Sequence, residues 1–417
     1  MPENPTVLGL QPTFGFGDRL GLATPGHLEA LRSRGGPIRG LFAQQSIREM
    51  TRTNRTPEEV MEAAVRDLEA VGYDEPWGAD ADHLKTPEDV DWTAAAGFVF
   101  FTIDPSDYVD NEADFDDPAV IERKFAEVEG ELPWLDDYRG KTIEVPEGPT
   151  ITFDELTLKR AAVKYGRAIE HSIKMGKYIG KVMGERAKDH EIEMSVDETP
   201  QPTTTAEHYL IADQLLKAGL KVVSLAPRYL GDFEKGIDFK GDVAEFEQSL
   251  AEHAAIARHL GPYKLSLHSG SDKLSIYPAF ARITQGQFHV KTAGTSYLEA
   301  LRVVARHSPQ LFRQIIDYSR GRFDEDKATY HISCDLHRAA KPDAVTDDSE
   351  LERIYLDEND GRQILHVTFG SVVTHEEFAP ALRNVLAKYP ETHRQVLAKH
   401  LGKHLELLNE GIAAAKG

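Results

Sequence analysis

Polar and charged residues follow a short, partly apolar stretch at residues 263–273, which reads YKLSLHSGSDK. Its first five residues alternate between apolar and polar types, which predicts a strand with one packed side. His268 then begins a run of six residues that also contains Asp272 and Lys273. An imidazole, a carboxylate and an amine this close together indicate a functional site. The alternative is an ordinary turn, because Gly, Ser and Asp are common turn residues.

Other predicted strands also end in residues of these types. Together the strand ends supply three histidines, several carboxylates and several bases, and no cysteine. Imidazole nitrogens and carboxylate oxygens are ligands for a divalent cation such as Zn, Mn, Co or Ni. The strand-end residues are Arg19, Gln44, Asp82, His83, Asp104, Asp197, Glu198, Arg228, His268, Lys273, His289 and Lys291. Ligands on different strands need no local motif, because closure of the sheet brings them together.

Side-chain alternation indicates which histidines share the inner face of their strands. His268 has the parity of Ser266, and His289 has the parity of Lys291, so both histidines are expected to point into a barrel. The alternative for His268 is a structural, hydrogen-bonded histidine. The alternative for His289 is a residue that only caps the polar top layer of the barrel.

The acidic strand ends are less clearly oriented. Asp82 and His83 are adjacent, so both can face a site only if their strand ends there. Asp197 has the inward parity, whereas Glu198 has the longer reach that suits an acid/base group. Asp104 precedes a proline and is more typical of a turn than of a ligand, and His83 has the alternative of a surface turn.

Eight short stretches, each followed by a helical pattern, are the elements that must position these residues. They lie at 7–11, 40–43, 77–83, 98–104, 191–198, 221–225, 263–268 and 287–291. Several helices begin at a Thr-Pro pair, as at Thr56-Pro57, and stop at a glycine, as at Gly72. Alternating strands and helices predict a parallel sheet, and eight repeats favour a closed TIM-type (β/α)8 barrel. An open doubly wound sheet is the alternative.

The chain divides into a barrel and two additions. We expect the barrel over residues 1–300, with an acidic, Pro- and Asp-rich insertion after the fourth strand at about 105–152. Residues 301–417 predict a helical C-terminal extension packed on the barrel, with one further strand candidate at 364–369. On the final helix of this extension, solvent-facing positions are expected for His393, His400 and His404.

Two glycine-containing segments resemble nucleotide or anion sites. Residues 14–21 read FGFGDRLG, but three residues instead of two separate the last two glycines, so this segment does not predict NAD binding. Gly294-Thr295-Ser296 begins the helix after the eighth strand, where free backbone N–H groups predict a phosphate or carboxylate site. The alternative there is an ordinary helix cap. The residues expected to bind an anionic substrate are Gln44, Arg228, Lys273 and Lys291.

Charge and cysteine content exclude several classes of protein. The 417 residues carry a formal net charge of −21, which argues against nucleic-acid and anionic-membrane partners. One cysteine, Cys334, excludes an internal disulfide framework and a cysteine-based zinc cluster, and it favours a reducing cytoplasm. The N-terminus has no signal-peptide pattern, and no apolar run approaches the length of a membrane span.

Several longer stretches together resemble the tagaturonate/fructuronate epimerase family. They are FAQQSIRE at 42–49, GADADHLK at 78–85, FTIDPSD at 101–107, SVDET at 195–199, EKGIDFKGD at 234–242, LHSGSDK at 267–273, FHVKTAGTSYLEA at 288–300, YHIS at 330–333 and LHVTFGSV at 365–372. The resemblance implies a metal-dependent isomerase that interconverts D-tagaturonate and D-fructuronate in hexuronate breakdown. On matching positions it implies proton transfer by Asp82 and Glu198 and metal binding by His83 and His268. His289 is added as a third metal ligand from its strand position.

The two ketohexuronates of this family differ at C4, counting the ketone as C2 and the carboxylate as C6. This carbon is β to both carbonyl groups, so its C–H is not acidified and retro-aldol cleavage is the expected route. The alternative enzyme is a metal-dependent ketose 3-epimerase or aldose–ketose isomerase. The alternative outside catalysis is a sugar-acid binding protein. We expect a small-molecule sugar acid as the ligand, with homo-oligomer formation left open.

Overall fold

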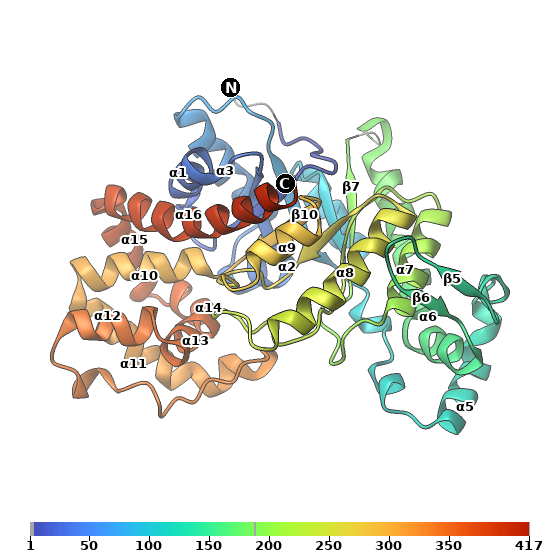
Figure 1. Cartoon of the computed structure of the whole chain (residues 1–417). Coiled ribbons are helices and arrows are strands. Elements are labelled where there is room, and N and C mark those ends of the chain that lie inside the picture. The colour runs from blue at the N-terminus through green and yellow to red at the C-terminus, as the bar shows by residue number, and fades with distance from the viewer. Residues whose placement is uncertain (1–3, 187–188, 417) are drawn as a thin grey trace.

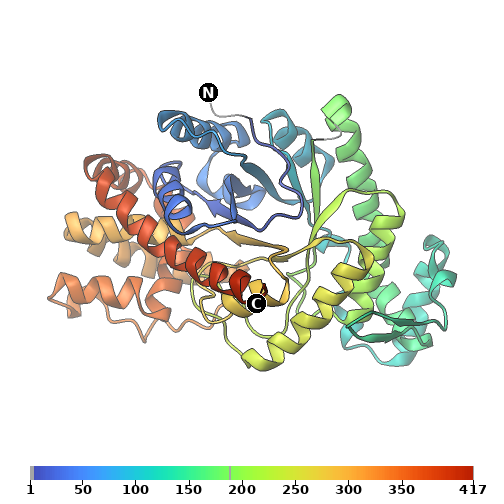
Figure 2. The ribbon, with the colours of Figure 1, turned by 45° about the horizontal axis from the view of Figure 1, so that its top comes forward.

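The computed structural model describes residues 4–186 and 189–416, and its centre is a closed barrel of eight parallel strands (Figures 1 and 2). The strand order around the barrel is β1-β10-β9-β8-β7-β4-β3-β2, so β1 pairs with both β2 and β10. The strands are β1 (Thr13–Gly17), β2 (Arg39–Ser46), β3 (Gly78–Leu84), β4 (Phe100–Ile103), β7 (Glu191–Ser195), β8 (Val222–Ala226), β9 (Lys264–Leu267) and β10 (Phe288–Thr292). The predicted (β/α)8 barrel is confirmed, and the open sheet is excluded.

The first strand lies later in the chain than the sequence pattern predicted. Residues 7–11 form no strand; Leu8 packs instead with Leu41 and Phe100 in a small apolar cluster. The strand is formed by the glycine-containing segment, because Gly17 approaches the backbone of β10 closely: a Cβ there would lie 2.3 Å from the Thr292 carbonyl oxygen. Because Gly17 has no side chain, β1 can lie against β10 and the barrel can close.

Helices surround the barrel, and several of them begin at the predicted Thr-Pro pairs. Thr56 and Thr86 each cap a helix, with a side-chain oxygen accepting a backbone N–H three residues on and a proline in the first turn. The helices are α1 (Thr24–Arg34), α2 (Ile47–Thr53), α3 (Pro57–Ala70), α4 (Pro87–Ala95), α6 (Glu155–Met183), α7 (Thr205–Lys217), α8 (Val243–Leu260) and α9 (Tyr277–Ile283). Among the described residues, no helix is both long and apolar enough to cross a bilayer.

The insertion after β4 forms a small lobe at one side of the barrel (Figure 1). It packs on the long helix α6, chiefly through α5 (Pro118–Val128). A two-stranded antiparallel hairpin joins β5 (Thr142–Glu144) to β6 (Thr150–Thr152). Short 3-10 turns complete this region, at Ser106–Tyr108, Asn111–Asp114, Glu129–Glu131 and Leu135–Asp137, with another after α6 at Gly184–Arg186.

A helical lobe with its own apolar core follows β10 on the opposite side (Figure 1). It consists of α10 (Thr295–His307), α11 (Pro309–Asp326), α12 (Asp348–Leu356), α13 (Asn359–Val367), α14 (Phe369–Val373) and α15 (Phe378–Lys388), with 3-10 turns at Lys327–Thr329 and Pro342–Ala344. The strand predicted at 364–369 is wrong. Ile364, Leu365 and Val367 are buried on helix α13, because this lobe offers helical packing partners and the closed barrel has no free edge.

The last helix, α16 (Pro390–Ala414), returns to the barrel and packs against α1 and α9 (Figure 2). Its residues Leu397, Leu401 and Leu405 belong to the same apolar core as the barrel strands. The expectation that its histidines face solvent is wrong for His393 and His404, which are buried. A domain boundary at residue 300 stays a prediction, since the final helix shares the core of the barrel.

Candidate active site

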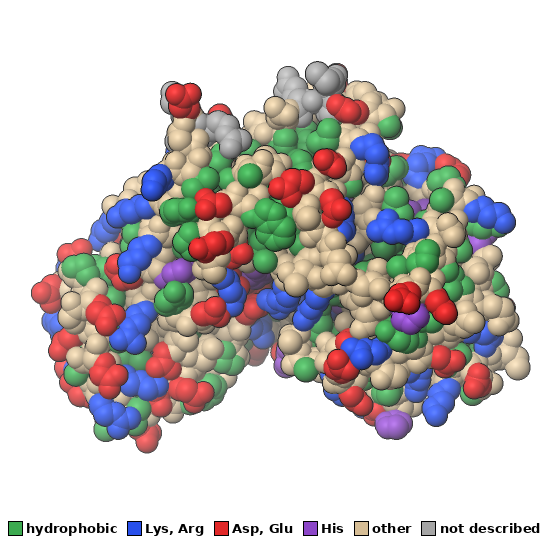
Figure 3. All heavy atoms as spheres, turned by 180° about the vertical axis from the view of Figure 1, so that it is seen from behind, with side chains coloured by type: hydrophobic (Ala, Val, Ile, Leu, Met, Phe, Trp, Pro, Cys, Tyr) green, Lys and Arg blue, Asp and Glu red, His purple; other side chains and the backbone are tan. Residues whose placement is uncertain are grey.

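A cleft of about 630 Å³ lies at the carboxyl ends of the strands, where both lobes meet the barrel. The space-filling view shows the molecule hollowed between the two lobes (Figure 3). The insertion contributes Asn111 to this cleft, and the helical lobe contributes Tyr330 and His331. Helix α2 contributes Arg48, and the barrel loops contribute Asp197, Glu198, Arg228, Lys235 and His268. The predicted location of the active site therefore coincides with a cleft.

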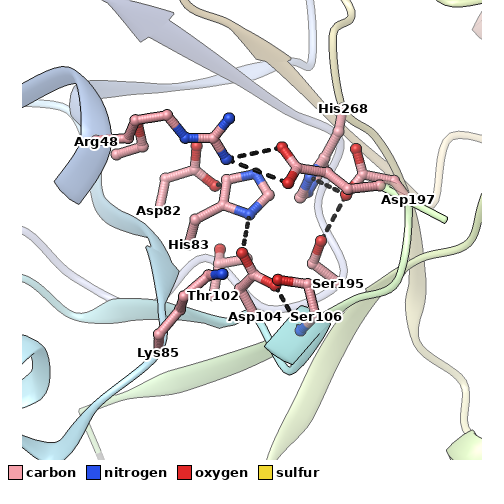
Figure 4. Close-up of polar contacts among 12 residues, drawn as sticks. Arg48, Asp82, His83, Lys85, Thr102, Asp104, Ser106, Ser195, Asp197 and His268 are labelled. Atoms are coloured by element: carbon pink, nitrogen blue, oxygen red, sulfur yellow. Dashed lines mark hydrogen bonds and ion pairs between the residues drawn. The ribbon is translucent and has the colours of Figure 1, made fainter. Parts of the chain in front are cut away.

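Asp82, His83 and His268 form a compact group at the inner end of the cleft (Figure 4). One potential ligand atom from each lies within 4.8 Å of those of the other two. The adjacent Asp82 and His83 both face the site because the backbone of His83 adopts φ of 54°, in the left-handed region. The ladder between β3 and β4 also shifts register there. This local irregularity resolves the ambiguity that strict alternation left open.

A second carboxylate holds each histidine ring in place (Figure 4). His83 Nδ1 lies 3.2 Å from Asp104 Oδ2, and its Nε2 lies 3.8 Å from Asp82 Oδ1. His268 Nε2 lies 2.7 Å from Glu193 Oε1. Its buried Nδ1 lies 3.0 Å from Asp197 Oδ1, as an ion pair. A histidine oriented by a carboxylate through one nitrogen, with the other nitrogen toward the site, is typical of metal centres.

The electrostatics of this group favour bound positive charge. Burial disfavours charged imidazoles, but the carboxylates of Asp82 and Asp104 raise the pKa of His83 to about 9. Burial also disfavours a charged His268, but the carboxylates of Asp197 and Glu193 raise the pKa of His268 to about 10. The carboxylates around the two rings therefore favour positive charge at this site.

Lys291 lies beneath this group and contacts three carboxylates. Its Nζ lies 2.7 Å from Asp82 Oδ1, 2.9 Å from Asp80 Oδ2 and 2.9 Å from Glu193 Oε1. It also donates to Thr102 Oγ1 at 2.5 Å. The side chain is only 4% exposed. Lys291 was predicted to bind substrate, but this amine is occupied by carboxylates of the protein.

His289 lies deeper in the barrel than the other predicted ligands. It precedes Lys291 by two residues on β10, its Nδ1 is 2.9 Å from Thr13 Oγ1, and its Nε2 is 3.5 Å from Asp80 Oδ2. It is fully buried. The structure does not bring His289 together with His83 and His268, and its role as a third ligand stays a prediction that this geometry does not favour.

The predicted proton-transfer residues lie at different depths. Asp82 belongs to the inner group, whereas Glu198 lies at the rim of the cleft with its side chain 37% exposed. Arg48 Nη2 donates to both oxygens of Glu198, at 2.9 and 3.2 Å. The neighbour Asp197, with the inward parity, is the residue that approaches His268.

The other residues predicted to bind substrate differ in accessibility. Arg228 lines the cleft and donates to the carbonyl oxygens of Tyr229 and Gly231, at 2.8 and 2.7 Å. Gln44 lines the inner cavity and is oriented with its amide nitrogen 3.0 Å from the Thr292 carbonyl oxygen. Lys273 is fully buried and donates to three backbone carbonyls, so its amine lies inside the loop structure and not in the cleft.

The predicted anion site at Gly294 is covered by a side chain. A Cβ at Gly294 would lie 1.9 Å from His366 Nε2, so the imidazole packs directly over the start of α10. Thr295 Oγ1 lies 2.6 Å from His400 Nε2 and is thereby also engaged. The inner cavity still reaches Gly294 and His366, but the prediction of an anion at this helix start gains no support from these contacts.

Four residues of this region were not singled out from the sequence. They are Asp80, Glu193, Arg48 and Lys235. Alternation along β7 contained a signal for one of them, because Glu193 has the parity of the inward-facing Ser195. On β3, Asp80 likewise has the parity of Asp82, so both side chains point to the same face of the strand. Arg48 lies on helix α2 and Lys235 lies on a loop, so strand alternation gives the orientation of neither.

Nearly the whole chain is similar to known proteins. A sequence model for a family described as tagaturonate epimerase matches residues 1–408. A tagaturonate/fructuronate epimerase of Thermotoga maritima is 43% identical over 404 residues, which cover 97% of this chain and 82% of that protein. Native and glycerol-bound crystal structures of a fructuronate-tagaturonate epimerase from Cohnella laeviribosi each superpose with a TM-score of 0.90, at 40% identity, covering 97% of this chain and 83% of the other.

Proposed function

Since the chain belongs to the tagaturonate epimerase family, we propose that it interconverts D-tagaturonate and D-fructuronate with the help of a divalent cation. The observation that carries the cation is the group of Asp82, His83 and His268, in which a carboxylate of another strand orients each imidazole. Family membership makes the chain an isomerase-class enzyme. The cation and the route of epimerisation are the new parts of the proposal.

The donor set fits a divalent metal such as Zn, Mn, Co or Ni. Two imidazole nitrogens and one carboxylate are a combination found in catalytic metal sites, which leave a position for substrate. His268 contributes a buried imidazole to this set, held by Glu193 on one nitrogen and with Asp197 beside the other. A bound cation supplies Lewis-acid stabilisation of negative charge on substrate oxygens.

The reaction that we propose is retro-aldol cleavage followed by re-addition. A base takes the proton of the C4 hydroxyl, the C3–C4 bond breaks, and its electrons form an enediolate across C2 and C3. The other product is a three-carbon aldehyde that carries the carboxylate. This fragment turns over, C3 attacks the opposite face of its carbonyl carbon, and the proton returns to the C4 oxygen.

Glu198 is the better placed proton-transfer residue for this step. It lies on the cleft rim and holds Arg48 beside it. Burial opposes ionisation of Asp82, but His83 and Lys291 hold the pKa of this carboxyl well below its usual range. A carboxylate of such low basicity suits a cation ligand better than a base, which changes the role that the sequence suggested for Asp82.

One experiment in D₂O tests both the activity and the route. Metal-stripped and metal-restored protein is incubated with D-tagaturonate, products are separated by chromatography, and C4 is examined for deuterium by NMR. We expect D-fructuronate only after metal is restored, with protium retained at C4. No conversion in either sample refutes the function, and deuterium at C4 refutes the retro-aldol route.

The same assay with His268→Ala tests the proposed ligand. This variant is expected to fold but to lose bound metal, measured by mass spectrometry of the metal, together with its activity. The matched control is His259→Ala, a histidine that is exposed on α8. Metal content that is equal in the two variants removes His268 from the ligand set.

A further inference from the structure

The loop at residues 234–237 is held in place through each of its backbone carbonyl oxygens. Lys273 Nζ donates to the carbonyls of Glu234 and Ile237, at 2.8 and 2.5 Å. Gln363 Nε2 lies 3.3 Å from the Lys235 carbonyl, and Arg362 Nε donates to the Gly236 carbonyl at 2.7 Å. Four consecutive carbonyls therefore accept hydrogen bonds from three buried side chains of the β9–α9 loop and α13.

Holding the 234–237 loop in this way costs free energy, because it buries polar and charged side chains. Lys273 is fully buried, and Arg362 and Gln363 are 7% and 1% exposed. Burial lowers the pKa of Lys273 to about 7, because the ammonium group has lost its surrounding water. Buried basic side chains of this kind are kept where a backbone segment must hold one position, as at binding sites that are preorganised by their supporting contacts.

The side chain that this loop carries into the cleft is Lys235. It lines both the outer cleft, beside Arg48 and Arg228, and the inner cavity that contains Asp82 and His83. Its Nζ lies 2.5 Å from Oγ of Ser269, the residue that follows His268 in the chain. Lys235 is thus the cation that lies at the junction between the outer cleft and the candidate metal group.

The other basic side chains of the cleft already have protein partners. Arg48 is bonded to both oxygens of Glu198. Arg228 donates to two carbonyls and has Asp232 at 3.7 Å. Within residues 4–186 and 189–416, no Asp or Glu oxygen lies within 4 Å of Lys235 Nζ. A lysine with unused donors beside a cleft is an anion-binding group.

We propose that Lys235, with the hydroxyl of Ser269, binds the carboxylate of the substrate and makes the enzyme select ketouronates over neutral ketoses. This inference rests on the proposed function and adds the residue that recognises the acid group. With the ketone end of the substrate at Asp82, His83 and His268, the carboxylate end points toward Lys235 and the outer cleft. Loss of this charge-assisted hydrogen bond then weakens the binding only of substrates that carry a carboxylate.

The test compares Lys235→Met with the wild-type protein on D-tagaturonate and on D-tagatose, which has the same ketose stereochemistry and no carboxylate. Dissociation constants are measured by calorimetry, and KM and kcat are measured in parallel. We expect binding of D-tagaturonate to weaken roughly 10- to 100-fold, with KM rising and kcat changing less, whereas D-tagatose binding stays unchanged. Lys235→Arg is expected to restore most of the D-tagaturonate affinity.

The control is Lys341→Met, which removes an exposed lysine of the helical lobe and is expected to leave both ligands unaffected. Unchanged D-tagaturonate binding in Lys235→Met refutes the proposal, and so does an equal loss for both ligands. Calorimetry separates this inference from the activity. If the wild-type protein converts no ketouronate, the proposed function fails, while a selective loss of D-tagaturonate binding still supports Lys235.

Discussion

At the scale of single residues, Lys291 links the buried carboxylates of the candidate site. Its amine contacts carboxylates from two other strands, namely Asp80 and Asp82 of β3 and Glu193 of β7. Burial opposes ionisation of Glu193, yet Lys291 and His268 hold the pKa of this carboxyl well below its usual range. Lys291 therefore keeps the carboxylates that orient the histidines in their charged form.

We predict that Lys291→Met lowers the free energy of unfolding by about 3 kcal/mol or more near neutral pH, because it leaves buried carboxylates without a cation. In the wild-type protein the low pKa of Asp82 and Glu193 means that their stabilisation is present above the ordinary carboxyl pKa of about 4 and is lost as the pH falls. The difference in the free energy of unfolding between the variant and the wild-type protein should therefore become smaller toward acidic pH. Denaturant unfolding at several pH values measures both effects.

The comparison for this variant is Lys85→Met, which removes a lysine 37% exposed and paired only at the surface with Asp107. Its cost should be at most about 1 kcal/mol. A deficit for Lys291→Met as small as that of the surface variant would show that the buried carboxylates do not need the amine.

At the scale of elements, the seam between β1 and β10 closes the barrel and brings β10, with Lys291, beside β1. Gly17 makes this seam possible, since the nearest atoms to a Cβ at this position belong to the backbone of Thr292 and Ala293. Backbone atoms of a paired strand cannot move aside as a flexible side chain can. The chemistry at the strand ends thus depends on a residue with no side chain.

We predict that Gly17→Ala destabilises the protein by about 1–3 kcal/mol, the usual range for overpacking, and also lowers activity by shifting β10. The matched substitution is Gly180→Ala in helix α6, where no atom lies within 4 Å of the added Cβ. This change should be neutral or should stabilise by up to about 1 kcal/mol, since alanine favours helix. Thermal unfolding and initial rates measure the pair, and similar behaviour of the two variants would contradict the role of the seam.

At the scale of the whole molecule, a cluster of ionic contacts joins the barrel, the helical lobe and the last helix. His400 of α16 lies 2.8 Å from Asp272 in the β9–α9 loop and 3.4 Å from Glu299 of α10. Arg362 of α13 also binds Asp272, at 3.0 Å. The nearby His404 is bonded on both ring nitrogens, to the His400 carbonyl and the Asp272 N–H. This cluster is therefore built to link elements.

We predict that His400→Gln destabilises the protein most at mildly acidic pH. Burial disfavours a charged His400, but Glu299 and Asp272 raise its pKa above the ordinary value. A raised pKa gives stabilisation that is complete below the unfolded value of about 6.5 and is lost as the pH rises through the folded value. Relative to wild type, the loss should be roughly 3 kcal/mol near pH 6 and smaller near pH 9.

Chemical unfolding of both proteins across this pH range gives the difference directly. The exposed His259, replaced in His259→Gln, serves as the histidine control and should show no such dependence. A stability difference for His400→Gln that stays constant with pH would mean that the imidazole is neutral in the folded protein.

The sequence by itself determined the class of fold and the region of the site. Strand and helix signals are local, since they depend on periodicity, caps and glycine stops within one segment. Eight such repeats were therefore sufficient to predict the barrel, and the polar ends of the strands were sufficient to place Asp82, His83 and His268 at one mouth. The first strand was misplaced because the glycines of β1 carry no strand propensity of their own.

Only the tertiary structure decided which polar residues meet. Parity gives the face of a strand but not the depth of a residue in the barrel, because depth depends on the stagger between neighbouring strands. This is why His289 lies below the histidine pair and why Lys291 contacts carboxylates of the protein. The direction of Lys273, the exposure of Lys235 and the return of α16 to the barrel depend on partners far away in the chain, and no local pattern encodes them.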